Sequence, residues 1–205
     1  MRRTILTFII YTIIYTLNAQ ENEIFIGKIS NDTSSFNEIP EHQNHLKSLL
    51  KSNDKIEIRY IKSKHPTIPT EYIVLKFNKI WEIEKTFFDT TIKKYVTIQL
   101  TPKINLDTLF KQLVNQRIFS LNDYTNINYD EYNTVFRIKE NDFTGHGGGT
   151  SGGPVYCIEY KVGDYFRRYK YFNPEYFIGI YKQVPDLNNF VEIINIFENF
   201  KQSKL

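Results

Sequence analysis

The chain has 205 residues and a formal net charge of +3, and 41% of its residues are hydrophobic. This length suits one domain with a core of its own or at most two small ones, and the nearly balanced charge does not indicate binding to nucleic acid. The single cysteine, Cys157, excludes an internal disulfide framework. Its place in an apolar run favours a buried thiol over a nucleophile.

The N-terminus has the pattern of a secretory signal peptide. Arg2 and Arg3 precede an uncharged apolar stretch from Thr4 to Leu17, and Ala19 offers a small residue at a cleavage point. The apolar stretch is shorter than the about 20 residues that a membrane-spanning helix needs. We therefore expect a signal peptide over residues 1–19 and a single secreted or periplasmic domain over 20–205, without a stable membrane anchor after cleavage.

A first helix is predicted from about Pro40 to Lys51. His42 and His45 lie three positions apart on it, which is a spacing that can hold a metal ion. No further His or Cys pair completes a coordination sphere, so we expect a solvated helix face and no metal.

Four strands in succession are predicted next, because apolar residues alternate with polar ones. They cover about 55–60, 71–78, 80–88 and 94–100. Two prolines within His65–Pro69 are expected to interrupt the pairing. Short links between successive strands favour an antiparallel sheet, with the last two strands forming a hairpin.

The second half of the chain adds two helices and a hairpin. Asn105 is expected to cap a helix that ends near Gln116, and Pro185 to begin the strongest helical pattern in the chain. Between these two helices we predict a surface loop over 122–133. Three further strands are predicted over 134–139, 155–161 and 165–172. Gly163 is expected to supply positive φ in the turn of the last strand pair. The predicted class is α+β: one domain in which about three helices pack on one face of a mainly antiparallel sheet.

A glycine-rich segment precedes the last strand pair. Its residues Gly149–Pro154 (GTSGGP) resemble the sequence around the nucleophile of trypsin-like serine proteases. On this hypothesis Ser151 is the nucleophile of a serine hydrolase, either a protease or an esterase, and His146 its base. The other candidate bases are His65, His45 and His42. His146 with Gly147, Gly148 and Gly149 also resembles the oxyanion glycines of esterases.

The sequence around this motif favours a non-catalytic interpretation. None of the histidines stands in the setting of a protease base, and Thr150 replaces the aspartate that precedes the serine. Motif matches without their structural context are mostly false positives. The serine hydrolase therefore remains the alternative, and the main hypothesis is a loop whose backbone, at Gly147, Gly148 and Gly149, can approach a ligand closely.

The strand Tyr165–Phe172 interleaves aromatic and basic residues, a composition that can stack on sugars or peptide side chains. Alternation places four candidate binding residues on one face: Tyr165, Arg167, Tyr169 and Tyr171. The competing interpretation is an ordinary strand with one buried and one solvated face.

A softer pattern covers most of the chain, from about Lys55 to Gln202. Its parts include VTIQLTP, TVFRIK, CIEYK and YFNPEYF. In their order they resemble the small, uncharacterised secreted proteins of Bacteroidota. This resemblance implies export but no activity. We therefore expect an exported, non-catalytic binding module without a cofactor, whose partner is a protein or a glycan.

Overall fold

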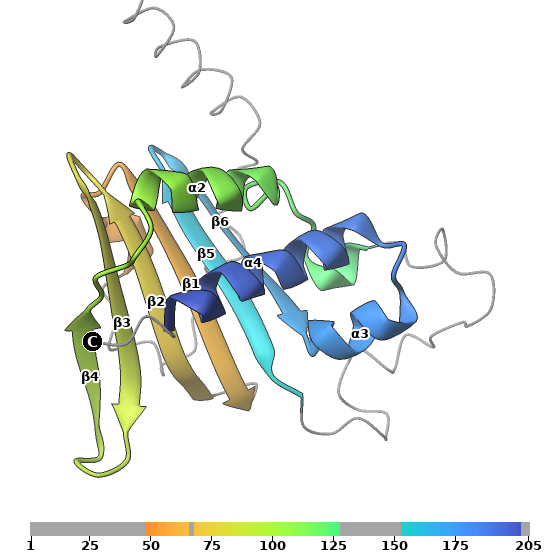
Figure 1. Cartoon of the computed structure of the whole chain (residues 1–205), viewed down its shortest axis with the longest axis horizontal. Coiled ribbons are helices and arrows are strands. Elements are labelled where there is room, and N and C mark those ends of the chain that lie inside the picture. The colour runs from red at the N-terminus through yellow and green to blue at the C-terminus, as the bar shows by residue number, and fades with distance from the viewer. Residues whose placement is uncertain (1–47, 66–67, 128–152, 202–205) are drawn as a thin grey trace, which may run out of the picture.

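The computed structural model describes residues 48–65, 68–127 and 153–201. Six strands form one antiparallel sheet in the order β4-β3-β2-β1-β5-β6. Their bounds are Ile56–His65 (β1), Ile68–Phe77 (β2), Trp81–Asp89 (β3), Lys94–Gln99 (β4), Val155–Val162 (β5) and Tyr165–Phe172 (β6). Together with the three α-helices of the described residues, this sheet confirms the predicted α+β class (Figure 1).

The strands follow the predicted alternation with one correction. We expected the prolines of His65–Pro69 to lie outside the sheet, but β1 runs to His65 and β2 begins at Ile68. Pro69 is paired with Ser63 at the end of this hairpin. The register shifts on both sides of Ser63. Proline has no backbone N–H to donate. It is tolerated at such an irregular strand end because the regular pattern of hydrogen bonds between the strands is already interrupted there.

Two of the three α-helices in the described ranges agree with the prediction. Helix α2 (Leu106–Asn115) begins after Asn105, whose side chain accepts a 2.7 Å hydrogen bond from the backbone N–H of Asp107, as expected of a cap. Helix α4 (Pro185–Lys201) begins at the predicted proline. Each helix turns an apolar stripe toward the sheet, which includes Leu109 and Leu113 on α2.

The short helix α3 (Pro174–Ile180) was not predicted. Asn173 adopts a left-handed conformation with φ of 43°, and Pro174 opens the helix. A proline fits the first turn of a helix, where its missing N–H has no intrahelical partner. The described residues also include two 3₁₀ turns, η3 (Leu49–Lys51) and η4 (Tyr124–Asn126).

Several predictions fall on residues outside the described ranges. They are the signal peptide, most of the first helix with His42 and His45, the strand Thr134–Lys139, and the glycine-rich segment up to Gly152. Within the described ranges, none of the helices combines the length and the apolar character that crossing a bilayer requires.

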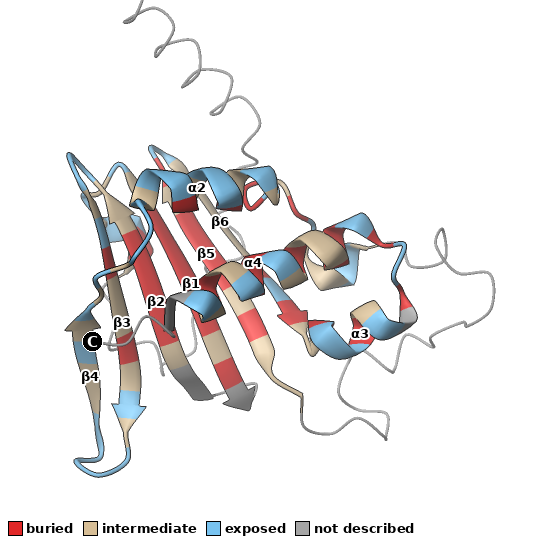
Figure 2. Ribbon diagram, in the orientation of Figure 1, coloured by how far each residue is buried: buried red, intermediate tan, exposed pale blue. Residues whose placement is uncertain are grey.

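The main core lies between the sheet and the helices α2 and α4, which cross the same face (Figures 1 and 2). Aromatic rings fill it. Tyr60 of β1 stacks on Phe197 of α4 with ring centroids 4.9 Å apart, and Tyr171 of β6 stacks on Phe190 at 3.9 Å. Such stacking adds to the stabilisation that burial of the ring surface provides.

The opposite face of the sheet has a different composition, although its centre is also buried. Alternation along β1 turns Glu57 and Arg59 to this face, and Arg59 pairs across the strands with Val74 on one side and Glu159 on the other. Arg59 is 4% exposed and Glu159 is 1% exposed. The carboxylate of Glu159 interacts with two arginines. Arg59 Nη1 lies 3.5 Å from it, and Arg168 Nε donates a 2.8 Å hydrogen bond to it. One face of the sheet is thus aromatic and apolar, and the other carries a buried network of charges.

Candidate functional site

The polar faces of α2 and α4 meet in a groove on the helix side of the molecule. Helical spacing places Gln112, Asn115 and Gln116 on one side of α2, because these positions are three and four residues apart. On α4 the same rule places Glu192, Asn195 and Asn199 on one side. All six line one cavity, together with Lys103, Ile104 and Ile196.

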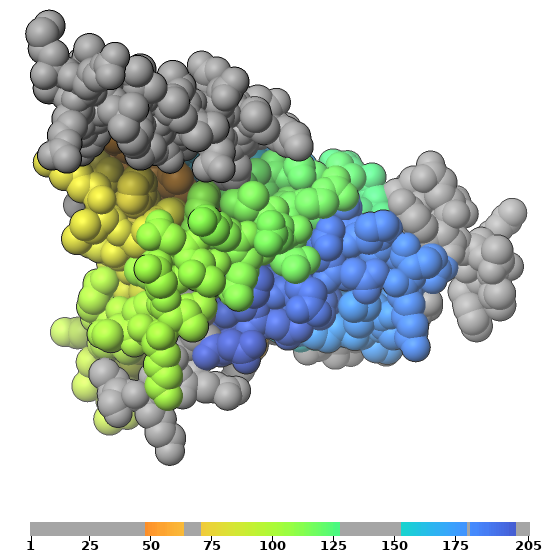
Figure 3. Space-filling model, turned by 45° about the horizontal axis from the view of Figure 1, so that its top comes forward, coloured from red at the N-terminus to blue at the C-terminus, as the bar shows by residue number. Residues whose placement is uncertain are grey.

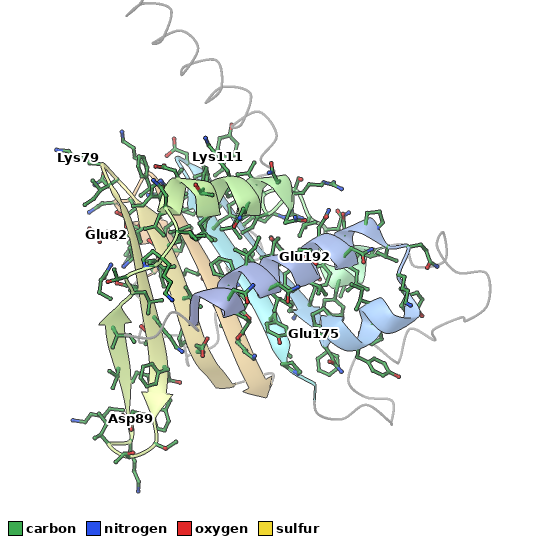
Figure 4. The ribbon with its side chains drawn as sticks, viewed as in Figure 1. Lys79, Glu82, Asp89, Lys111, Glu175 and Glu192 are labelled. Carbon is green, nitrogen blue, oxygen red and sulfur yellow. The ribbon has the colours of Figure 1, made fainter. Side chains whose placement is uncertain are left out.

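The cavity has a volume of about 430 Å³, which is within the range of small-molecule sites. Figure 3 shows α2 in green beside α4 in blue, and Figure 4 labels Glu192 on α4. Ile196 packs against the core, while Ile104 is 41% exposed. The groove therefore combines polar walls with apolar contact area.

Five carboxamide side chains dominate the lining: Gln112, Asn115, Gln116, Asn195 and Asn199. Within the described part of the chain, none of these side chains makes a hydrogen bond to another residue. Each carboxamide offers an oxygen that accepts and an NH₂ group that donates two hydrogen bonds. The groove can therefore recognise a neutral ligand that both donates and accepts hydrogen bonds.

The walls of the groove are fastened to the sheet by specific contacts. The indole Nε1–H of Trp81 on β3 donates a 2.7 Å hydrogen bond to Asp107 Oδ1 at the start of α2, and its ring packs on Phe110. On α4, Glu198 accepts hydrogen bonds from the Tyr60 hydroxyl at 2.7 Å and from Lys62 Nζ at 3.1 Å. Both helices are thus held on a rigid sheet, which favours a preformed groove.

The predicted aromatic face of β6 points toward the helices. Tyr169 and Tyr171 are 0% and 1% exposed, and their hydroxyls donate hydrogen bonds to the backbone carbonyls of Ile118 and Asn122. Burial raises the pKa of the Tyr169 hydroxyl well above its usual value. These two rings are therefore part of the hydrophobic core. Tyr165 and Arg167 are half-buried, and ligand binding at this face stays a prediction.

The catalytic alternative falls mainly outside the described ranges, which include neither Ser151 nor His146, nor the three glycines Gly147, Gly148 and Gly149. Gly153, the second glycine of the SGGP string, is described. A Cβ atom placed on it would lie 2.3 Å from Cγ of Asn173. Close packing against Asn173 therefore explains a glycine at this position without reference to an oxyanion.

Two further site types receive no support from the described residues. Across 48–65, 68–127 and 153–201, no group of three or more His, Cys, Asp or Glu side chains is arranged to hold a metal ion. Burial raises the pKa of the Cys157 thiol above its ordinary value, with a further contribution from Glu159. A thiol in this state is a poor nucleophile.

Comparisons with models of protein families, with curated proteins and with solved structures find no match to this chain. Sequence reasoning did not identify the carboxamide groove. The sequence pattern that could have indicated this groove is the helical spacing of Gln and Asn residues on α2 and α4. That spacing defines two polar helix faces but does not reveal that the faces meet in the fold.

Proposed function

We propose that the protein is an exported binding module that holds an uncharged glycan in the groove between α2 and α4. The observation that carries this proposal is the meeting of five carboxamides, without hydrogen-bond partners among the described residues, in one cavity of about 430 Å³. Free donors and acceptors in a groove lose water on binding and need matching groups on the ligand. The hydroxyls of a sugar supply both.

The charges and apolar groups of the groove also favour a glycan. Among the described lining residues, only Lys103 and Glu192 are charged, and their opposite signs give this lining no net charge that would select an ionic ligand. Ile104 and Ile196 offer apolar area to the C–H face of a sugar ring. A neutral, hydroxyl-rich ligand with apolar ring faces matches this combination.

The test is a screen of the purified protein against an array of neutral oligosaccharides, followed by calorimetric titration of the best one. The variants Gln116→Met and Asn195→Leu keep side-chain size and remove one carboxamide from each wall. Each is expected to weaken binding about tenfold, since a lost hydrogen bond costs about 1 kcal/mol or somewhat more. Gln99→Met is the matched control, because Gln99 is exposed on β4, away from the groove.

Two results would contradict the proposal. One is the absence of binding to any neutral oligosaccharide on the array. The other is binding that both groove variants and the Gln99→Met control leave equally strong.

Export is the second part of the proposal and rests on the N-terminal sequence. We expect the mature protein to begin at Gln20, after cleavage behind Ala19. N-terminal sequencing of the protein recovered from the secreted or periplasmic fraction tests this. Recovery of the intact chain from the cytoplasm would argue against export.

The serine hydrolase with Ser151 as nucleophile stays a prediction. Labelling of the folded protein with a fluorophosphonate probe, beside Ser151→Ala and a heat-denatured sample, separates the two functions. Labelling that requires both the fold and Ser151 would replace the binding module with an enzyme.

A further inference from the structure

The second face of the sheet places charged residues where burial favours apolar ones. Arg59 and Glu57 lie on the central strand β1, and each is 4% exposed. Burying charges costs free energy, and apolar residues in such positions often give an equal or higher stability. Stability alone therefore does not explain this composition.

A cavity of about 370 Å³ lies over this face. Its floor crosses strands β1 to β4, and its wall consists of Lys51, the last residue of η3, and the segment 52–54 that follows. The charged residues of the lining are Glu57, Arg59, Lys76 and Glu84 on the floor and Lys51 and Asp54 on the wall. None of these residues lines the groove between α2 and α4, so the two cavities are separate.

The charges of the floor neutralise one another. Arg59 Nε lies 2.7 Å from Glu57 Oε1, and Lys76 Nζ lies 2.6 Å from Glu84 Oε1. Val74 separates these two ion pairs with an apolar side chain that is 1% exposed. At the far end, the hydroxyls of Thr86 and Thr97 are 2.8 Å apart. The floor is thus polar, and its charges are already compensated.

The two remaining charges of the lining lie on its wall and have opposite signs. Among the described residues, the Lys51 ammonium has no hydrogen-bond or ionic partner. Within the described ranges, the Asp54 carboxylate accepts one hydrogen bond, from the neutral Ser52 hydroxyl at 3.4 Å. The cavity therefore presents one positive and one negative charge that have no ionic partner among the described residues.

We propose that this cavity binds a small zwitterion of the amino acid or dipeptide class, with its carboxylate at Lys51 and its ammonium group at Asp54. A ligand with a single charge would be attracted by one of these residues and repelled by the other. A zwitterion compensates both charges and leaves the floor ion pairs intact. The volume is within the range of small-ligand sites. This inference does not rest on the glycan groove.

The test uses methyl NMR of the full protein titrated with alanyl-alanine. The methyl groups of Val74, Thr86 and Thr97 report on this cavity, and those of Ile104 and Ile196 report on the groove between the helices. Two matched probes each lack one charge: N-acetyl-alanyl-alanine has no ammonium group, and alanyl-alanine amide has no carboxylate. We expect saturable shifts at Val74, Thr86 and Thr97 with alanyl-alanine and about fivefold weaker binding of each matched probe.

Two single variants assign the contacts. The Lys51→Gln variant is expected to bind alanyl-alanine no more tightly than it binds alanyl-alanine amide. The Asp54→Asn variant is expected to bind alanyl-alanine no more tightly than it binds N-acetyl-alanyl-alanine. Both residues lie on the wall outside the sheet, so the floor methyl signals verify that each variant is folded. The absence of shifts at the three cavity residues would overturn the proposal. Equal binding of all three probes, or shifts confined to Ile104 and Ile196, would overturn it as well.

Discussion

The hydroxyl of Tyr60 donates a 2.7 Å hydrogen bond to Glu198 Oε1, which joins the central strand of the sheet to the last turns of α4. Lys62 Nζ reaches the same oxygen at 3.1 Å. The Tyr60 ring also stacks on Phe197, the residue before Glu198. The Tyr60–Glu198 hydrogen bond thus helps to hold the helix that forms a wall of the carboxamide groove.

Tyr60→Phe removes this hydrogen bond and keeps the stacked ring. The free energy of unfolding is expected to fall by about 1.5 kcal/mol, because the lost bond has a carboxylate as its acceptor. Urea denaturation followed by the fluorescence of Trp81 measures the change. Tyr176→Phe is the control, since Tyr176 is 48% exposed. Equal stability of the two variants would mean that the bond to Glu198 contributes nothing.

Stability should decline in alkali. Burial, and then the hydrogen bond to Glu198, raise the pKa of Tyr60 above its ordinary value, and burial raises the pKa of Tyr169. Their contribution is complete below about pH 10, where tyrosine in the unfolded chain is neutral. At higher pH the unfolded chain loses protons while the folded chain keeps them, so the free energy of unfolding falls until pH reaches the folded pKa.

Urea denaturation at several pH values from about 9 to 11 tests this decline, and the ultraviolet absorption of tyrosinate should appear together with unfolding. Tyr169→Phe removes one of these groups, so its stability should fall less steeply with pH. A slope identical to that of the unchanged protein would exclude Tyr169 from the effect.

Because Glu159 lies beside two buried arginines, removal of its negative charge should lower the free energy of unfolding. Glu159→Gln keeps the shape of the side chain but removes the negative charge between Arg59 and Arg168. We expect a loss of about 3 kcal/mol, because removal of one partner leaves buried positive charge less compensated. Denaturant unfolding measures the loss.

A second variant checks that cause. Adding Arg168→Leu to Glu159→Gln removes the cation that depends most on Glu159, so part of the lost stability should return. A double variant less stable than Glu159→Gln would show that the guanidinium of Arg168 stabilises the fold without this carboxylate.

The interpretation that Gly153 of the SGGP string is required by close packing against Asn173 can be tested by substitution. Gly153→Ala is expected to destabilise the protein by about 1–3 kcal/mol, because the added methyl group would overlap the Asn173 side chain. Asn173 has φ of 43°, a conformation that glycine adopts readily. Asn173→Gly should therefore be tolerated and should restore most of the stability of Gly153→Ala. Thermal unfolding of the two single variants and the double variant tests this, and purely additive losses would contradict the contact.

Local sequence rules predicted the elements whose signals are local. The Asn105 cap, the bounds of β6 and the positive φ of Gly163 depend on neighbouring residues only, and the structure agrees with all three. Helix α3 was missed because its seven residues show too little periodicity and begin at an Asn-Pro pair typical of turns.

Features that depend on tertiary assembly could not be predicted in this way. Alternation along β1 showed that Glu57 and Arg59 share a face, but their burial requires knowledge of the whole sheet. The burial of Tyr169 and Tyr171 likewise depends on α4, which comes later in the chain. Both candidate cavities combine segments far apart in sequence, so no local pattern indicates them.

The strand order has a consequence for biosynthesis. Strand β1 pairs with β2, its neighbour in the chain, and with β5, which follows much later. As the chain is made, the β1–β4 meander can pair before β5 exists, and β1 then keeps one open edge of unpaired N–H and C=O groups. Such an edge can pair with another chain. A protein of this topology depends on prompt synthesis of its C-terminal hairpin, and we expect fragments that end before Val155 to aggregate.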